Sequence, residues 1–196
     1  SKKYSVDLFE KNNHFGGHSF TVDVPDIGTN EIISLDLGFI VFNKNTYPNL
    51  IKFFDDLNIS YEKSDMSFAV SVLNSNVEYS GTGLNGLFVN KSNFFNLKFL
   101  KMIKEIFLFY KEAEKINTEH HKNQTLGYFL KKKKYSKYFI NFHIIPMVAA
   151  IWSMPPNLAE EIPMNLFLNF FKNHGLFKLK NRPQWYTVTG RSKTYV

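Results

Sequence analysis

The residues best suited to chemistry lie near the start of the chain, at positions 4–18, which read YSVDLFEKNNHFGGH. Positions 4–9 alternate apolar and polar side chains, which predicts a short β-strand. This strand would end at Glu10, and Gly16 and Gly17 follow. A carboxylate at a strand end can accept hydrogen bonds from both hydroxyls of a ribose, and adjacent glycines let the backbone approach a phosphate. A strand followed by a plain turn is the structural alternative.

A β-hairpin is predicted to follow this stretch and to support it. Residues 19–24 alternate and residues 31–42 are strongly apolar, with a polar turn at 25–30 between them. The second of these strands contains Asp36 and Gly38. A glycine inside such a strand indicates either a bulge or the close approach of another group.

Most of the remaining chain carries helical patterns, with strands near its ends. Helices are predicted over residues 47–57, 98–115, 163–173 and 138–152, the last with a kink at Pro146, and another helix starts at Thr125. Strands are predicted over 65–72, 77–79 and 185–188. In the helix over 98–115 we expect an apolar stripe that includes Phe107 to be buried and Glu105 to face water.

Six phrases of this chain occur in the order found in one group of proteins. They are LFEKNNHFGGH at 8–18, GFIVFNKNTYPNL at 38–50, SDMSFAVS at 64–71, AAIWS at 149–153, FFKNHGL at 170–176 and RPQWYTVTG at 182–190. The chain thus resembles the flavin-containing amine oxidoreductase superfamily, and most of all a bacterial branch of predicted NAD/FAD-binding amine oxidases. The resemblance extends over nearly the whole chain.

The resemblance implies a fold and a function. The fold would be α/β with an α+β mix: residues 1–60 would belong to an FAD-binding Rossmann-like domain, and residues 61–196 to a substrate domain that is largely helical in its middle. The protein would be an FAD-dependent oxidoreductase, a dehydrogenase or desaturase, that oxidises a C–N or C–C bond of an apolar small-molecule or lipid substrate. A non-catalytic fragment or lipid-binding module that keeps this fold is the alternative.

The resemblance also assigns cofactor contacts, whereas no catalytic residue can be named. The positions that match the family's FAD contacts are Glu10, Asn12, Gly16, Gly17, His18, Gly38, Phe39 and Ile40. Relatives commonly carry arginine in place of Asn12 and His18. Asn12 and His18 can hydrogen-bond phosphate, but they lack the permanent charge and the bidentate guanidinium group of arginine.

One family feature is missing from its usual place. A G-x-G-x-x-G turn should lie about thirty residues before the acid that binds the ribose. Only nine residues precede Glu10 here, and none of them is glycine. We therefore expect an internal fragment of a longer enzyme, and we expect residues 1–196 alone not to retain FAD.

Composition and charge exclude several classes of protein. The chain lacks cysteine, which removes disulfides and thiolate chemistry and agrees with a cytoplasmic location. The sequence has no run of eighteen apolar residues, so no membrane span is predicted, although peripheral membrane contact stays open. The net charge of +7 is partly concentrated in the lysines at 131–134, a run that we interpret as a solvated helix end and not as a nucleic-acid site. The composition and motifs of the sequence make no prediction of oligomeric state.

The histidines offer little support for a metal or catalytic site. His120 and His121 are adjacent, so their side chains would point apart, and we expect no metal there. His143 lies in an apolar segment, which favours a hydrogen-bonded core histidine over a catalytic base.

Overall fold

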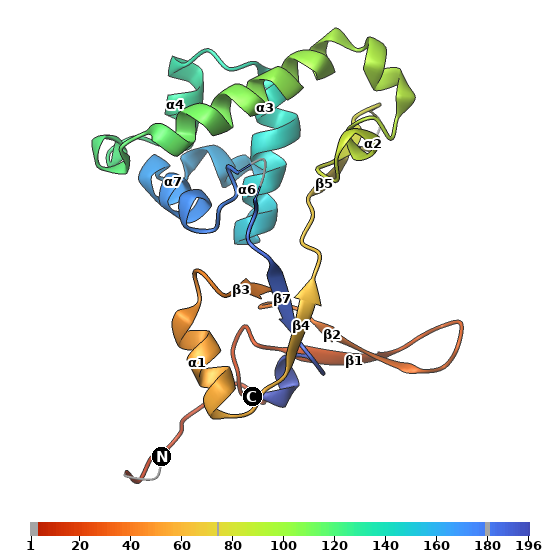
Figure 1. Cartoon of the computed structure of the whole chain (residues 1–196), viewed down its shortest axis with the longest axis vertical. Helices are drawn as coiled ribbons and strands as arrows, with labels where there is room; N and C mark the ends of the chain where they lie inside the picture. Colours follow the sequence, from red (N-terminus) through yellow and green to blue (C-terminus); the bar gives the residue numbers. More distant parts are fainter. Residues whose placement is uncertain (1–3, 74, 179–180) are drawn as a thin grey trace. The chain divides into compact units, whose positions relative to one another are not determined.

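The computed structural model describes residues 4–73, 75–178 and 181–196 and consists of two compact units (Figure 1). The first unit combines Ser1–Met66 with Pro183–Val196, and the second is the intervening segment Ser67–Arg182. The fold is mixed α/β with small sheets, and every strand pair within them is antiparallel. The strands at 61–64 and 185–188 therefore belong to the first unit, which extends past the predicted boundary at residue 60. The assignment of the units to FAD and substrate domains stays a prediction.

The predicted hairpin is confirmed in the first unit. Strand β1 (Thr21–Pro25) pairs with β2 (Ile32–Asp36), with Thr21 opposite Asp36. The turn closes through a 2.7 Å hydrogen bond from the Asp26 N–H to the Glu31 carbonyl oxygen. Asn30 takes a positive φ of 58°, which asparagine tolerates better than most residues.

A three-stranded sheet and one helix make the core of the first unit. The sheet order is β3 (Phe42–Asn43), β7 (Trp185–Val188), β4 (Tyr61–Ser64), and helix α1 spans Pro48–Asp56. Proline suits the first turn of α1 because its missing N–H would have no helical partner there. Phe42, Phe54 and Val188 are buried together. The short helix η5 (Ser192–Thr194) completes this unit.

The predicted strand at residues 4–9 is wrong for the described part of the chain. Residues 4–10 are not in a strand, and the side chains of Tyr4, Val6, Leu8 and Phe9 are exposed. A strand exists only through hydrogen bonds to a neighbouring strand, and no described segment pairs with this one. Alternation therefore identified a segment capable of being a strand, but not a partner for it.

The second unit is a helical body with one hairpin. It contains β5 (Ala69–Ser71), β6 (Glu78–Ser80), α2 (Leu84–Leu87), η1 (Lys91–Phe95), α3 (Leu97–Lys115), η2 (Thr118–His121), α4 (Leu126–Lys132), α5 (Lys137–Phe139), η3 (Ile140–Ile144), α6 (Ile145–Trp152), η4 (Pro156–Glu161) and α7 (Met164–Asn173). Figure 1 shows α3 as its longest helix, with α4, α6 and α7 nearby. Their apolar faces form one buried cluster.

Helix α3 confirms the predicted helix but corrects two of its side chains. Phe107 is exposed, and Glu105 is buried. The Glu105 carboxylate accepts hydrogen bonds from the backbone N–H and the hydroxyl of Ser136, the residue that caps the N-terminus of α5. A carboxylate at a helix N-terminus satisfies free amide groups, so burial of Glu105 is compensated by the helix that it contacts.

The predicted helix over residues 138–152 is confirmed, and the helix type changes from π to α next to its proline. Residues Ile140–Ile144 form a π-helical segment, and α6 starts immediately afterwards with Pro146 in its first turn. Proline lacks the N–H that would bond to the carbonyl four residues earlier, so the helical hydrogen-bond ladder must change locally at this point.

Candidate functional site

Two of the predicted cofactor-contact segments lie against each other in the first unit. The Phe39 N–H donates a 2.8 Å hydrogen bond to the carbonyl oxygen of His18. The Leu37 N–H donates a 2.9 Å bond to Phe20 in the same register, so the hairpin ladder continues beyond the ends of β1 and β2. The loop of Gly16, Gly17 and His18 is thereby fixed beside Gly38.

Gly38 is required by this close approach. A Cβ at residue 38 would lie 2.2 Å from the His18 carbonyl oxygen, far inside van der Waals contact. Gly16 has a φ of +98°, and a Cβ there would lie 2.5 Å from the Ser19 carbonyl oxygen. The glycines thus have a structural role in closing the loop, whether or not a ligand binds there.

Gly17 differs from its neighbours because it faces open space. It is exposed, its φ is +57°, and a Cβ would meet nothing within 4 Å. His18 and Ile40 are also exposed, whereas Phe39 is half-buried with its ring 6.0 Å from that of Tyr47. The backbone of this segment is therefore available to a ligand, while the Phe39 side chain packs on the core of the unit.

The structure gives Glu10 and Asn12 a local contact with each other. Glu10 is exposed, and its Oε1 accepts a 2.8 Å hydrogen bond from the Asn12 N–H. This bond shapes the turn after residue 10 and leaves carboxylate lone pairs facing solvent. The arrangement is compatible with a hydrogen-bond acceptor for a ribose but does not by itself place one.

Asp36 is the most connected polar residue of the region, and the sequence did not single it out for a role. Its Oδ1 accepts hydrogen bonds from the Thr21 hydroxyl at 2.7 Å and from the Ser192 hydroxyl at 2.8 Å. The Ser192 N–H adds a bond of 3.0 Å. The carboxylate thus joins the hairpin to η5. Its position two residues before Gly38 was visible in the sequence, but its partner 156 positions away was not.

A G-x-G-x-x-G pattern does occur in the chain, at residues 81–86. It begins directly after β6 and extends into α2, in the second unit. The dinucleotide fingerprint requires a long helix within a parallel βαβ unit. Here α2 has four residues and β6 pairs antiparallel with β5. The pattern therefore lacks the setting that would make it a phosphate loop.

His143 is a buried titratable group of the second unit whose two ring nitrogens both have hydrogen-bond partners. Its Nδ1 lies 2.8 Å from the Tyr79 hydroxyl and its Nε2 lies 3.0 Å from the Tyr110 hydroxyl. Burial lowers the pKa of His143 to about 3 and raises the pKa of both tyrosines. The prediction of a hydrogen-bonded core histidine is confirmed, because both ring nitrogens have partners.

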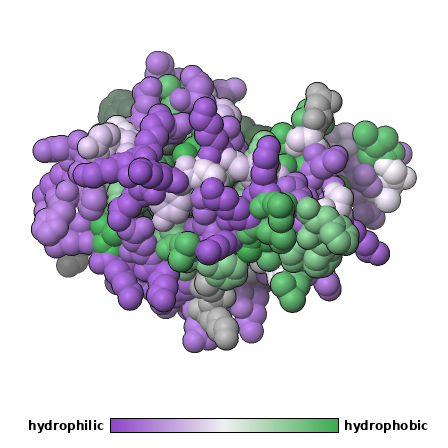
Figure 2. Space-filling view, turned by 90° about the horizontal axis from the view of Figure 1, so that it is seen from above, coloured by the Kyte–Doolittle hydropathy of each residue, from purple (hydrophilic) through white to green (hydrophobic). Residues whose placement is uncertain are grey.

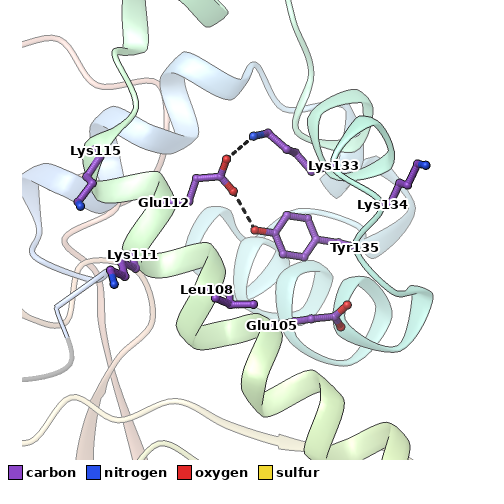
Figure 3. A pocket seen from close by; sticks show the side chains of 8 residues that line it. All are labelled: Glu105, Leu108, Lys111, Glu112, Lys115, Lys133, Lys134 and Tyr135. Atoms are coloured by element: carbon purple, nitrogen blue, oxygen red, sulfur yellow. Dashed lines mark hydrogen bonds and ion pairs between the residues drawn. The ribbon is translucent and has the colours of Figure 1, made fainter.

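An open pocket of about 500 Å³ lies along α3 near the lysine run (Figure 3). Glu112 points into it and bonds to Lys133 and to the Tyr135 hydroxyl. The run begins with an ion pair of 2.7 Å between Lys131 and Glu160. The lysines lie at the C-terminal end of α4 and just beyond it, which confirms a helix end and favours ordinary surface ion pairs.

The described residues contain neither a group of metal ligands nor a membrane-spanning helix. Among residues 4–73, 75–178 and 181–196, no three His, Cys, Asp or Glu side chains are grouped as metal ligands would be. No helix in this part of the chain is both long and apolar enough to cross a membrane.

Comparison with known proteins supports a limited assignment. The family model of the NAD(P)-binding Rossmann-like domain matches residues 1–57, which include the loop at Gly16–His18 and the segment at Gly38. No curated protein matches the chain. The family match covers the predicted cofactor contacts and ends at residue 57, immediately after helix α1.

Proposed function

We propose that this protein is an FAD-dependent oxidoreductase that acts on an apolar organic substrate. The observation that carries the proposal is the match of residues 1–57 to a Rossmann-like dinucleotide-binding domain. Such a domain supports a dinucleotide cofactor, FAD or NAD(P), and the oxidoreductase chemistry that these cofactors perform. The six ordered phrases favour FAD within that class.

The residues at the loop junction fit a dinucleotide. Gly17 is open to solvent and Gly38 is held against the His18 backbone, so backbone atoms there can be reached without an intervening side chain. Glu10 would accept hydrogen bonds from the ribose hydroxyls, and Asn12 and His18 would contact phosphate oxygens. Gly16, Gly17, Gly38, Phe39 and Ile40 would line the approach to the ring system.

The chemistry of the reaction would come from the cofactor. A bound flavin accepts a hydride or electrons from a C–N or C–C bond, and the protein supplies binding, orientation and the exclusion of water. This division of labour agrees with the described residues, in which the most perturbed histidine is buried and fully hydrogen-bonded. We assign no catalytic acid or base.

The test is to purify the product of the complete reading frame and to identify any cofactor released on denaturation. Stoichiometric FAD supports the proposal. Nicotinamide dinucleotide without flavin would instead identify a nicotinamide-dependent dehydrogenase. Absence of both, in protein that is folded and has been incubated with each dinucleotide, would favour the non-catalytic, lipid-binding alternative.

A further inference from the structure

A long segment of the second unit carries positive charge with no negative charge. Between Glu78 and Glu105 there is no Asp or Glu, whereas Lys91, Lys98, Lys101 and Lys104 are all exposed. The segment covers α2, η1 and the first two turns of α3. An anionic partner would therefore meet no opposing carboxylate within this segment.

The same segment exposes large apolar side chains. They are Leu84, Val89, Phe94, Phe95 and Leu97. Phe95, the last residue of η1, is 90% exposed, and Leu97, the first residue of α3, is 80% exposed. Single exposed apolar residues are common on protein surfaces, but five within fourteen positions mark a contact surface.

The local structure holds these side chains outward. The rings of Phe88 and Phe94 stack with centroids 3.9 Å apart. The Asn90 side chain accepts a hydrogen bond from the Ser92 N–H, and the Asn96 side chain accepts bonds from the first turn of α3. These side chains thus cap the N-termini of η1 and of α3. Phe95 lies on a turn whose backbone is already fixed.

Helix α3 continues the surface along its outer side. Its inner face packs in the core through Phe99, Met102 and Phe109. The outer face carries exposed Leu100 and Leu108 among lysines, instead of the purely polar residues expected of a helix whose other face is buried. Helices that lie on membranes combine apolar and lysine side chains in this way.

We propose that this apolar–lysine surface (Leu84, Val89, Phe94, Phe95 and Leu97 with Lys91, Lys98, Lys101 and Lys104) docks the protein on an anionic lipid bilayer. The apolar side chains would enter the acyl boundary and the lysines would contact lipid phosphates and carboxylates. Figure 2 shows green hydrophobic side chains gathered on the surface of the molecule among purple hydrophilic ones.

The composition of the surface favours a bilayer over other anionic partners. Nucleic-acid sites rely on arginine and on bases stacked in a groove, whereas this segment contains no arginine and its most exposed aromatic residue, Phe95, lies at the end of the short helix η1. A docked protein partner would need an acidic rim around an apolar pocket. An anionic bilayer presents negative headgroups beside an apolar acyl layer over its whole area. It does not require a complementary shape.

The test is cosedimentation of the 196-residue chain with vesicles of equal parts phosphatidylserine and phosphatidylcholine, compared with pure phosphatidylcholine. We expect binding to the anionic vesicles that weakens as salt is raised. Phe95→Ala should weaken it about tenfold, because burial of a phenylalanine contributes at least that factor. Lys98→Gln should weaken it about fivefold.

The control is Ile27→Ala, which removes a fully exposed apolar side chain from the hairpin turn of the first unit and should leave binding unchanged. Unchanged circular dichroism of all variants excludes unfolding as the cause. The proposal is overturned if the chain does not bind anionic vesicles, or if Phe95→Ala and Lys98→Gln bind as the parent does. It is also overturned if Phe95→Ala abolishes a self-associated state in the absence of vesicles.

Discussion

The Tyr79 hydroxyl donates a 2.9 Å hydrogen bond to the carbonyl oxygen of Phe142, to which Pro146 cannot make the α-helical hydrogen bond because it has no N–H. Residue 142 lies four positions before the proline, where an ordinary residue at 146 would have supplied the N–H. A side chain from β6 therefore satisfies a backbone group in the π-helical segment. The single Tyr79 hydroxyl proton is used in this bond, so the Tyr79 oxygen must accept a hydrogen bond from His143. The imidazole proton therefore lies on Nδ1.

Tyr79→Phe should lower the free energy of unfolding of the second unit by about 1–3 kcal/mol, because it leaves a buried carbonyl and a buried imidazole short of a partner. Denaturant unfolding followed by Trp152 fluorescence, in a Trp185→Phe background, would measure the effect in this unit. Tyr128→Phe, at a tyrosine that is 53% exposed, is the matched control and should be nearly neutral.

Pro146→Ala sharpens that experiment, because it restores an N–H that can bond to the Phe142 carbonyl. In the Pro146→Ala background, the loss caused by Tyr79→Phe should shrink. An equal loss in both backgrounds would show that Tyr79 acts through His143 alone.

Acid should destabilise the second unit through His143. Its folded pKa of about 3 is below the ordinary value of 6.5, so the unfolded chain binds the extra proton as the pH falls below 6.5. Stability is then fully present above that pH and declines towards pH 3, by as much as about 2 kcal/mol at pH 5. His143→Gln keeps hydrogen-bonding capacity without titrating, and the difference in unfolding free energy between pH 7 and pH 5 should be smaller for it. A variant with the same pH dependence as the parent would exclude His143 as the cause.

Gly38→Ala should destabilise the first unit by about 1–3 kcal/mol, because the added methyl overlaps the His18 carbonyl and the backbone must shift. Trp185 fluorescence in a Trp152→Phe background reports unfolding of this unit. Gly28→Ala is the matched control, since a Cβ there has ordinary contact at 3.7 Å from Asp26. Equal stability of the two variants would contradict the close approach of residues 18 and 38.

Glu10→Ala in the product of the complete reading frame should weaken FAD binding roughly ten- to a hundredfold, because hydrogen bonds to a charged acceptor contribute about 1.5–3 kcal/mol. Glu10→Gln should lose less, because an acceptor oxygen is retained. The exposed Glu31→Ala is the control for loss of charge. Titration of apoprotein with FAD measures all three, and unchanged affinity in Glu10→Ala would remove this residue from the site.

Local patterns in the sequence predicted most of the elements. The spacing of Phe99, Met102 and Tyr110 identified α3, and the four residues of β7 were predicted with their limits. These succeed because periodicity records which face of an element is buried. The wrong assignments concern partners: Glu105 is buried because Ser136 lies beside it, and residues 4–9 are not a strand because no described strand forms a ladder with them.

The residues of the candidate site were likewise predicted only in part from the sequence. Gly16, Gly17, His18 and Gly38 were named from the sequence, and the structure brings the two segments together. Asp36 was passed over because its importance depends on Ser192, which is distant in sequence. Local sequence patterns give the side chains but not such long-range hydrogen bonds, and a cofactor role for the named residues stays a prediction.

The position of β7 between β3 and β4 has a consequence for synthesis on the ribosome. A chain emerges from its N-terminus, so β3 and β4 leave the exit tunnel long before the strand that must lie between them. The helical unit at 67–182 emerges in one uninterrupted piece and can fold during this interval. The smaller unit, although it is made first, closes last, and until then two strand edges of a nascent chain need protection from aggregation.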